Sequence, residues 1–187
     1  MKLPLLIGVL AVGGCGSTDD RPRTLEYITD TILAPTCAVA ECHSAFKMEV
    51  GDEFDTVEAA RRSMVANGLL NYSSDEGPAG STLILSMTVG VPSLLDPPTR
   101  VRMPYDGPMP DADIALIEAW IAEGAHGAQC VPNDAGNGCS ATTVGTGTTG
   151  VTTFHVVKCT DGNIGDVVMD CPASSVCSYA TGNGQCK

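Results

Sequence analysis

The sequence predicts an all-α domain, then a flexible linker, then a small disulfide-rich module of strands or loops. Apolar residues recur at helical spacing through the first two thirds of the chain. Residues 132–153 are mostly Gly, Thr, Ser and Ala, a composition typical of linkers. The chain has 9 Cys, and most of them lie in its last third. A module this short cannot bury a sufficient core, so disulfides are its expected substitute.

Four helices are expected in the first domain. Their predicted ranges are 24–36, 56–66, 81–87 and 111–123. Thr24 is expected to cap the first helix, which ends near Pro35. Asp111 is expected to cap the last helix, and Gly124 follows its end. The stretch 91–110 carries so many Pro that no regular element is expected there.

The first residues predict export from the cytoplasm. Residues 1–14 hold one Lys, a short apolar stretch and small residues, as a secretory signal peptide does. Val12-Gly13-Gly14-Cys15 resembles the bacterial lipoprotein box. That resemblance implies lipidation of Cys15, a membrane lipid anchor and a place in the bacterial cell envelope, facing the periplasm or on the cell surface, with the outer membrane favoured. The alternative is an ordinary signal peptide that leaves Cys15 as a stray thiol.

The expected organisation follows from these features. It consists of a signal peptide at 1–14, a lipidated tether at 15–23, the all-α domain at 24–130, the linker at 131–153 and the Cys-rich module at 154–187.

Charge excludes one class of partner. The chain has 22 acidic and 10 basic side chains, a formal net charge of −12. A nucleic-acid-binding protein needs a basic face, so no nucleic-acid partner is expected. No apolar run reaches the roughly 20 residues that a transmembrane helix needs.

The last six cysteines are candidates for three disulfides, which can be arranged in fifteen ways. They are Cys130, Cys139, Cys159, Cys171, Cys177 and Cys186. A disulfide between Cys130 and Cys139 is the one pairing suggested. The module resembles small secreted modules with a Cys-Pro-x-Gly-x-x-Cys hairpin, some of which bind chitin. Ser174 replaces the Gly, and only Phe154 and Tyr179 could stack on sugar, so a structural or adhesive role is favoured over carbohydrate binding.

The motif that carries chemistry is Cys37-Ala38-Val39-Ala40-Glu41-Cys42-His43. Covalent haem attachment uses Cys-x-x-Cys-His, in which each thiol adds across a porphyrin vinyl group and the His binds the iron. Here four residues separate the cysteines, while the Cys-His pair is intact. Cys37, Cys42 and His43 also offer three zinc donors, but structural zinc needs four.

The chain around this motif resembles the single-haem cytochrome c domain of bacterial envelope proteins. The resemblance covers roughly residues 24–128 and includes Arg102-Met103-Pro104 and the helix that ends in Glu123-Gly124-Ala125. It implies an all-α fold around one covalent haem c, with His43 and Met103 as axial ligands. The implied function is electron transfer without catalysis, and redox proteins with basic patches are the expected partners of this acidic surface.

Several alternatives remain open at this point. Met109 and Met87 are the other candidates for the second axial ligand, while His126 and His155 are weaker ligand candidates. The rival function is a haem-free surface lipoprotein in which Cys37 and Cys42 form a disulfide and the tail binds or adheres. A peroxidase is a third alternative, and it would need an open sixth position on the iron.

Overall fold

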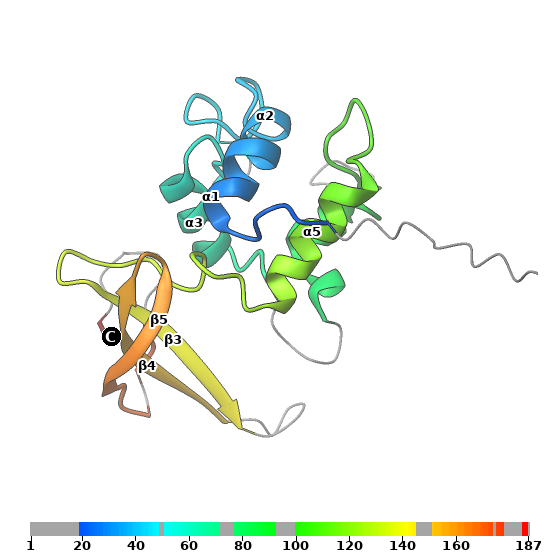
Figure 1. The fold of residues 1–187 in the computed structure, drawn as a ribbon. Helices are drawn as coiled ribbons and strands as arrows, with labels where there is room; N and C mark the ends of the chain where they lie inside the picture. Colours follow the sequence, from blue (N-terminus) through cyan, green and yellow to red (C-terminus); the bar gives the residue numbers. More distant parts are fainter. Residues whose placement is uncertain are drawn as a thin grey trace, which may run out of the picture.

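The structure is a computed structural model and describes residues 19–48, 51–71, 77–92, 100–144, 151–173, 175–177 and 185–186. A helical region and a three-stranded antiparallel sheet make up the described chain (Figure 1). The predicted signal peptide, the predicted lipidation site Cys15 and the aromatic Tyr179 lie outside the described residues.

The chain is mixed α and β, so the predicted all-α cytochrome fold is wrong. The longest described helix, α5, has only 12 residues, Asp111–Ala122. Strands β3 (Asn137–Val144), β4 (Val151–Thr160) and β5 (Asn163–Asp170) form the sheet, in that order. A short antiparallel pair also crosses the Pro-rich stretch, where the sequence predicts no regular element. It consists of β1 (Val91–Pro92) and β2 (Arg100–Val101).

Residues 25–36 form one helical segment with a wider turn in its middle. It consists of α1 (Leu25–Ile28), the π-helical η1 (Thr29–Leu33) and α2 (Ala34–Thr36). Thr24 caps it as predicted, because its Oγ1 accepts a hydrogen bond from the N–H of Tyr27 at 3.2 Å. Pro35 has no N–H and its ring crowds the carbonyl four residues back, which a wider π turn accommodates. The helix ends one residue after Pro35, close to its predicted end.

Two further helices form where the sequence predicts them. They are α3 (Val57–Ala66) and α4 (Thr82–Met87), with the 3-10 turn η3 (Pro78–Gly80) before α4. The hydroxyl of Ser81 accepts a hydrogen bond from the N–H of Asn71 at 2.8 Å, and the N–H of Leu83 donates to the carbonyl of Leu69 at 3.0 Å. These bonds fix the start of α4 against the segment that follows α3.

Helix α5 forms part of the core of the helical region. Pro110 is its N-cap and Asp111 its first residue, so the prediction that Asp111 caps the helix is wrong. Asp111 still lies in the first turn, where a carboxylate interacts favourably with the helix dipole. Trp120 is fully buried, and its Nε1 donates to the carbonyl of His126 at 3.1 Å. Gly124 follows the helix with φ +100°, as its predicted position requires.

The predicted linker at 131–153 is strand along much of its length. β3 and the first residues of β4 fall inside it and pair antiparallel, with Cys139 opposite Val156 and Val144 opposite Val151. Thr and Val are β-branched and suit a pleated sheet, so this composition supports strands as well as a linker. Residues 145–150 of the predicted linker lie outside the described residues.

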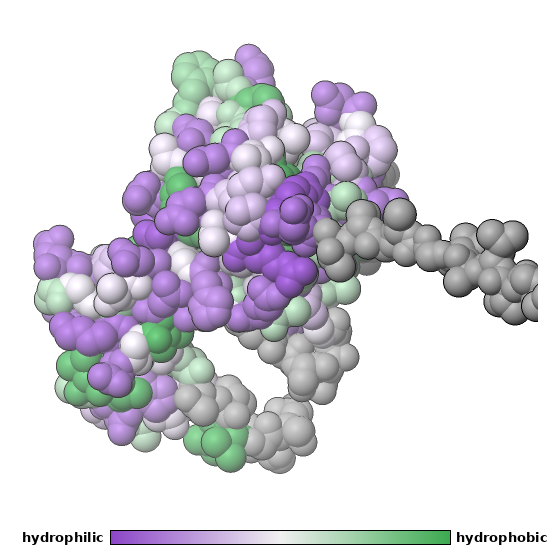
Figure 2. Space-filling model, in the orientation of Figure 1, coloured by the Kyte–Doolittle hydropathy of each residue, from purple (hydrophilic) through white to green (hydrophobic). Residues whose placement is uncertain are grey.

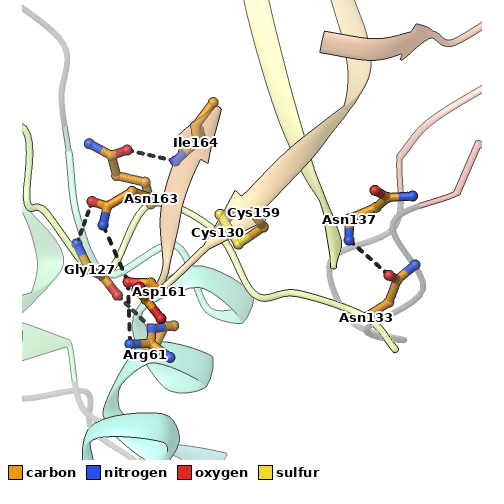
Figure 3. Close-up of a disulfide and its surroundings, with 10 residues drawn as sticks. Arg61, Gly127, Cys130, Asn133, Asn137, Cys159, Asp161, Asn163 and Ile164 are labelled. Carbon is orange, nitrogen blue, oxygen red and sulfur yellow. Dashed lines mark hydrogen bonds between the residues drawn. A yellow bond between two sulfur atoms is a disulfide. The ribbon is translucent and has the colours of Figure 1, made fainter. Parts of the chain in front are cut away.

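The sheet is fixed to the helical region at the turn between β4 and β5 (Figure 3). Arg61 of α3 donates from Nε to the carbonyl of Gly127 at 2.6 Å. The N–H of Gly127 donates to Oδ1 of Asn163 at 2.8 Å. A disulfide joins Cys130, at the end of the helical region, to Cys159 of β4. The sequence predicts only a flexible linker between the two regions and none of these contacts.

The six cysteines of the tail form three disulfides, as predicted. The pairs are Cys130–Cys159, Cys139–Cys177 and Cys171–Cys186. The suggested Cys130–Cys139 pair is wrong, because strand pairing brings Cys159 rather than Cys139 to the end of the helical region. A small core of Cys139, Val156, Cys171 and Cys177 packs around two of the disulfides.

Candidate functional site

A cavity of about 470 Å³ lies within the helical region. A volume of this size is typical of pockets for small molecules and cofactors, which span about 300–1,000 Å³. The cavity is lined by the end of the first helical segment, the loop that follows it, α4, and the loop that follows β2. Its lining residues are Pro35, Thr36, Cys37, Val39, Cys42, His43, Asp52, Phe54, Leu69, Thr82, Leu83, Ser86, Met87, Met103, Pro104, Tyr105 and Asp106.

The loop after α2 folds back on itself and brings both predicted thiols and the predicted imidazole to the cavity. The N–H of Cys42 donates to the carbonyl of Val39 at 2.8 Å, and the N–H of His43 donates to the carbonyl of Cys37 at 3.1 Å. Four intervening residues are therefore accommodated by a turn between the two cysteines. Cys37 and Cys42 are both free thiols rather than a disulfide.

The side chain of His43 is buried and keeps one nitrogen without a partner. The residue is only 9% exposed, and its ring lies 5.4 Å from the ring of Phe54, centroid to centroid. The carbonyl of His43 accepts from the N–H of Phe54 at 2.8 Å, which holds the two residues together. Nδ1 of His43 has no hydrogen-bond partner among the described residues. A buried polar atom left unpaired is costly and uncommon in folded proteins.

Burial shifts the pKa of two groups that border the cavity. Burial raises the pKa of the Cys37 thiol, and a contact of 3.5 Å with Oγ1 of Thr36 opposes that shift. Burial also raises the pKa of the Asp52 carboxyl, while the hydrogen bond from Nδ2 of Asn67 at 2.6 Å and the charge of His43 oppose the shift.

Two thioethers line the same cavity. Met103, predicted from its Met-Pro context, is half-buried there, and its N–H donates to the carbonyl of Ser86 at 2.8 Å. Met87 at the end of α4 also lines the cavity. Met109, the other candidate, is buried in the core of the helical region and is not one of the lining residues.

The two weaker histidine candidates do not line the cavity. His126 is exposed after α5. His155 lies in β4, where its Nδ1 is 2.7 Å from Oδ1 of Asp170 in β5.

Sequence reasoning missed Asp52, Phe54 and Leu69 as cavity residues. They come from segments with no motif, and only the folding of the loop against α3 and α4 brings them to the site. The aromatic character of Phe54 was not a signal, because Phe46, eight residues earlier, is 84% exposed.

The surface around this loop is partly apolar. Val39, Phe46 and Met48, all in the loop after α2, are among the exposed apolar residues of the described chain. Figure 2 shows apolar surface at the end of the helical region near α2 and again over the sheet, with hydrophilic surface between them.

Comparison with known proteins gives no match: no family model, no curated protein and no solved structure is significantly similar to this chain. Among the described residues, no group of three or more His, Cys, Asp or Glu is placed to hold a metal ion. No helix of the described chain is long and apolar enough to cross a bilayer.

Proposed function

We propose that this protein is an envelope-anchored electron carrier that binds one covalent haem c. Cys37 and Cys42 would hold the porphyrin through thioether bonds, and His43 and Met103 would be the axial ligands of the iron. The observation that carries the proposal is that these four side chains, chosen from the sequence alone, line one cavity. The proposal rests on this site and not on an all-α fold.

The two thiols suit covalent attachment. Both are free, both border the cavity, and the turn between them brings the ends of the longer loop back together. The remaining six cysteines of the described chain are used in disulfides and cannot compete for the porphyrin. Burial raises the pKa of the Cys37 thiol, which lowers the fraction present as thiolate, the form that oxidises.

The other side chains suit a six-coordinate iron. His43 borders the cavity, and its ring lies 5.4 Å from the ring of Phe54, centroid to centroid. Met103 offers a soft thioether sulfur, and its backbone is tied to α4. When bound, the haem supplies a one-electron couple, and a His/Met pair raises its potential. The chain itself supplies a mostly apolar cavity wall.

The cellular setting of the proposal is the bacterial envelope. Three disulfides support an oxidising compartment outside the cytoplasm, as the predicted signal peptide and the lipoprotein-like Cys15 do. The acidic chain would meet redox proteins through their basic patches. If His43 and Met103 both bound the iron, no position would be left open for a peroxide, so an electron carrier is favoured over a peroxidase.

The test is whether the chain carries covalently bound haem. We expect the full chain, made in a host with cytochrome c maturation, to keep its haem absorption after denaturation and acid–acetone extraction. Mass spectrometry should place one haem on the peptide that contains Cys37 and Cys42. Replacing both by Ser should remove the pigment, because no thioether can then form.

His126→Ala is the matched control, because it removes an exposed imidazole outside the cavity. It should retain haem with an unchanged spectrum, whereas His43→Ala should lose the low-spin spectrum. If the chain carries no pigment and Cys37 and Cys42 form a disulfide with each other, the proposal is wrong. The haem-free lipoprotein is then the favoured function.

A further inference from the structure

We propose that Met87 is an alternative thioether ligand, which binds the iron when Met103 does not. The inference rests on the proposed function and deepens it, because it concerns the same cavity. It assigns a role to a buried methionine that the Met-Pro pattern does not single out.

Backbone contact places the two methionines next to each other. Helix α4 ends at Met87, and the N–H of Met103 donates to the carbonyl of Ser86, the preceding residue, at 2.8 Å. Ser86, Met87 and Met103 all line the cavity. The two thioethers are therefore carried by neighbouring backbone segments that both border the cavity.

The two segments differ in how firmly they are held. Met87 is 2% exposed and belongs to the core of the helical region, together with Leu83 and Ile84 of the same helix. Met103 lies in a loop. Tyr105 and Asp106, which follow it in this loop, are exposed, Tyr105 by 71%. Displacement of this loop removes Met103 from the cavity and leaves Met87 in place.

The chemistry of methionine suits a change of ligand. Its side chain is unbranched, has three rotatable bonds and ends in a polarisable sulfur, so it can reach a new partner without moving the helix. A thioether that replaces a thioether leaves the ligand type of the iron unchanged. Met109 does not share this role, because it is buried outside the cavity.

The experiment compares three variants of the full, haem-loaded chain. They are Met103→Leu, Met103→Leu with Met87→Leu, and Met103→Leu with Met109→Leu as the matched control. Leu is close to Met in volume, so each core stays packed. Electron paramagnetic resonance measures the low-spin fraction, and near-infrared magnetic circular dichroism identifies a thioether ligand. Far-ultraviolet circular dichroism checks the fold.

We expect Met103→Leu to stay low-spin with a thioether ligand. The control that lacks Met103 and Met109 should have the same low-spin fraction and the same thioether signal. The variant that lacks Met103 and Met87 should lose nearly all of its low-spin fraction, and added imidazole should restore it if the cavity is intact. A high-spin Met103→Leu, or a thioether signal that survives loss of both residues, overturns the inference while the haem itself supports the proposed function. A chain that takes up no haem overturns both.

Discussion

Gly162, in the turn between β4 and β5, lies against Gly127 and Arg61 of the helical region. Its φ is +77°, and a Cβ at this position would lie 2.0 Å from the carbonyl oxygen of Gly127 and 2.4 Å from Nε of Arg61. Its own carbonyl accepts hydrogen bonds from the N–H groups of Gln129 and Cys130. Only glycine combines this backbone conformation with this contact.

We therefore expect Gly162→Ala to lower the free energy of unfolding by more than the cost of placing Ala at a positive φ. Gly136→Ala is the matched control, because Gly136 has φ +71° and a Cβ there would meet nothing within 4 Å. The control should cost about 1–2 kcal/mol of unfolding free energy in urea. Gly162→Ala should cost clearly more, since the Arg61–Gly127 contact must also open. Equal losses in the two variants would show that the close approach contributes nothing.

Asp52 makes the stability depend on pH. Burial raises the pKa of its carboxyl above 3.8, so the folded chain holds this proton more tightly than the unfolded chain. The free energy of unfolding therefore falls as pH rises from the unfolded pKa through the folded one. Asp52→Asn removes the charge, and its side-chain oxygen can still accept from Asn67.

We expect Asp52→Asn to be more stable than the wild type at neutral pH, with a difference that shrinks as the pH falls below the raised pKa. Urea unfolding across this pH range measures it. Asp134→Asn removes an exposed carboxyl and should stay within about 0.5 kcal/mol of the wild type. A variant that is less stable than the wild type at neutral pH would mean that the charge of Asp52 is stabilising.

At the residue scale, sequence and structure agree where a motif is contiguous. Cys37, Cys42 and His43 lie within seven positions, so a local turn suffices to bring them to the cavity. Asp52 and Leu69 reach the same cavity through tertiary packing, of which the sequence carries no local trace. The haem-binding roles of Cys37, Cys42, His43 and Met103 remain predictions.

At the scale of elements, Thr56 illustrates why the helices are predictable. Its Oγ1 accepts a hydrogen bond from the N–H of Ala59 at 3.2 Å and so satisfies one of the free donors at the start of α3. Capping residues and apolar spacing are both local signals. They are read directly from the sequence, and α3 accordingly has nearly its predicted bounds.

Thr56→Ala should lower the free energy of unfolding by about 1 kcal/mol, because it removes the side-chain cap of α3. Thr56→Ser keeps the hydroxyl and should retain most of that stability. Thermal and urea unfolding measure both variants. If Ser were as destabilising as Ala, the methyl group of Thr56 rather than its hydrogen bond would be the stabilising part.

The strands were harder to predict than the helices. A Gly- and Thr-rich run satisfies the composition of a linker and the β-branched preference of a strand equally, and only pairing partners decide between them. Val156 and Val157 of β4 supply that pairing, opposite Cys139 and Gly138 of β3. Such contacts join distant residues, so local composition does not reveal them.

At the scale of the whole molecule, the two regions are stabilised differently. The helical region has a conventional core around Trp120 and Ile117. The sheet has a core of four buried residues, three of them cysteines, so its disulfides replace hydrophobic burial. The number of disulfides followed from composition and length. Their pairing did not, because it depends on the register of the sheet.

Charge is the other property of the whole molecule. The formal net charge is −12, and several of the few cations are already engaged in ion pairs, among them Arg21 with Asp113 and Arg23 with Glu123. The cavity wall itself includes Asp52 and Asp106. A charged reactant that approaches the cavity therefore meets a negative potential, which salt screens over about 10 Å at 0.1 M ionic strength.

We expect this potential to control the rate at which the proposed reduced haem protein gives up its electron. Oxidation by the cationic complex tris(1,10-phenanthroline)cobalt(III) should slow several-fold as ionic strength rises from about 0.01 to about 0.15 M, because salt screens the attraction. Oxidation by the anionic complex hexacyanoferrate(III) is the matched control and should accelerate over the same range. Stopped-flow absorbance measures both rates. Salt effects of the same sign for the two complexes would mean that the local field at the cavity, rather than the net charge, governs approach, and the expectation of partners with basic patches would lose its basis.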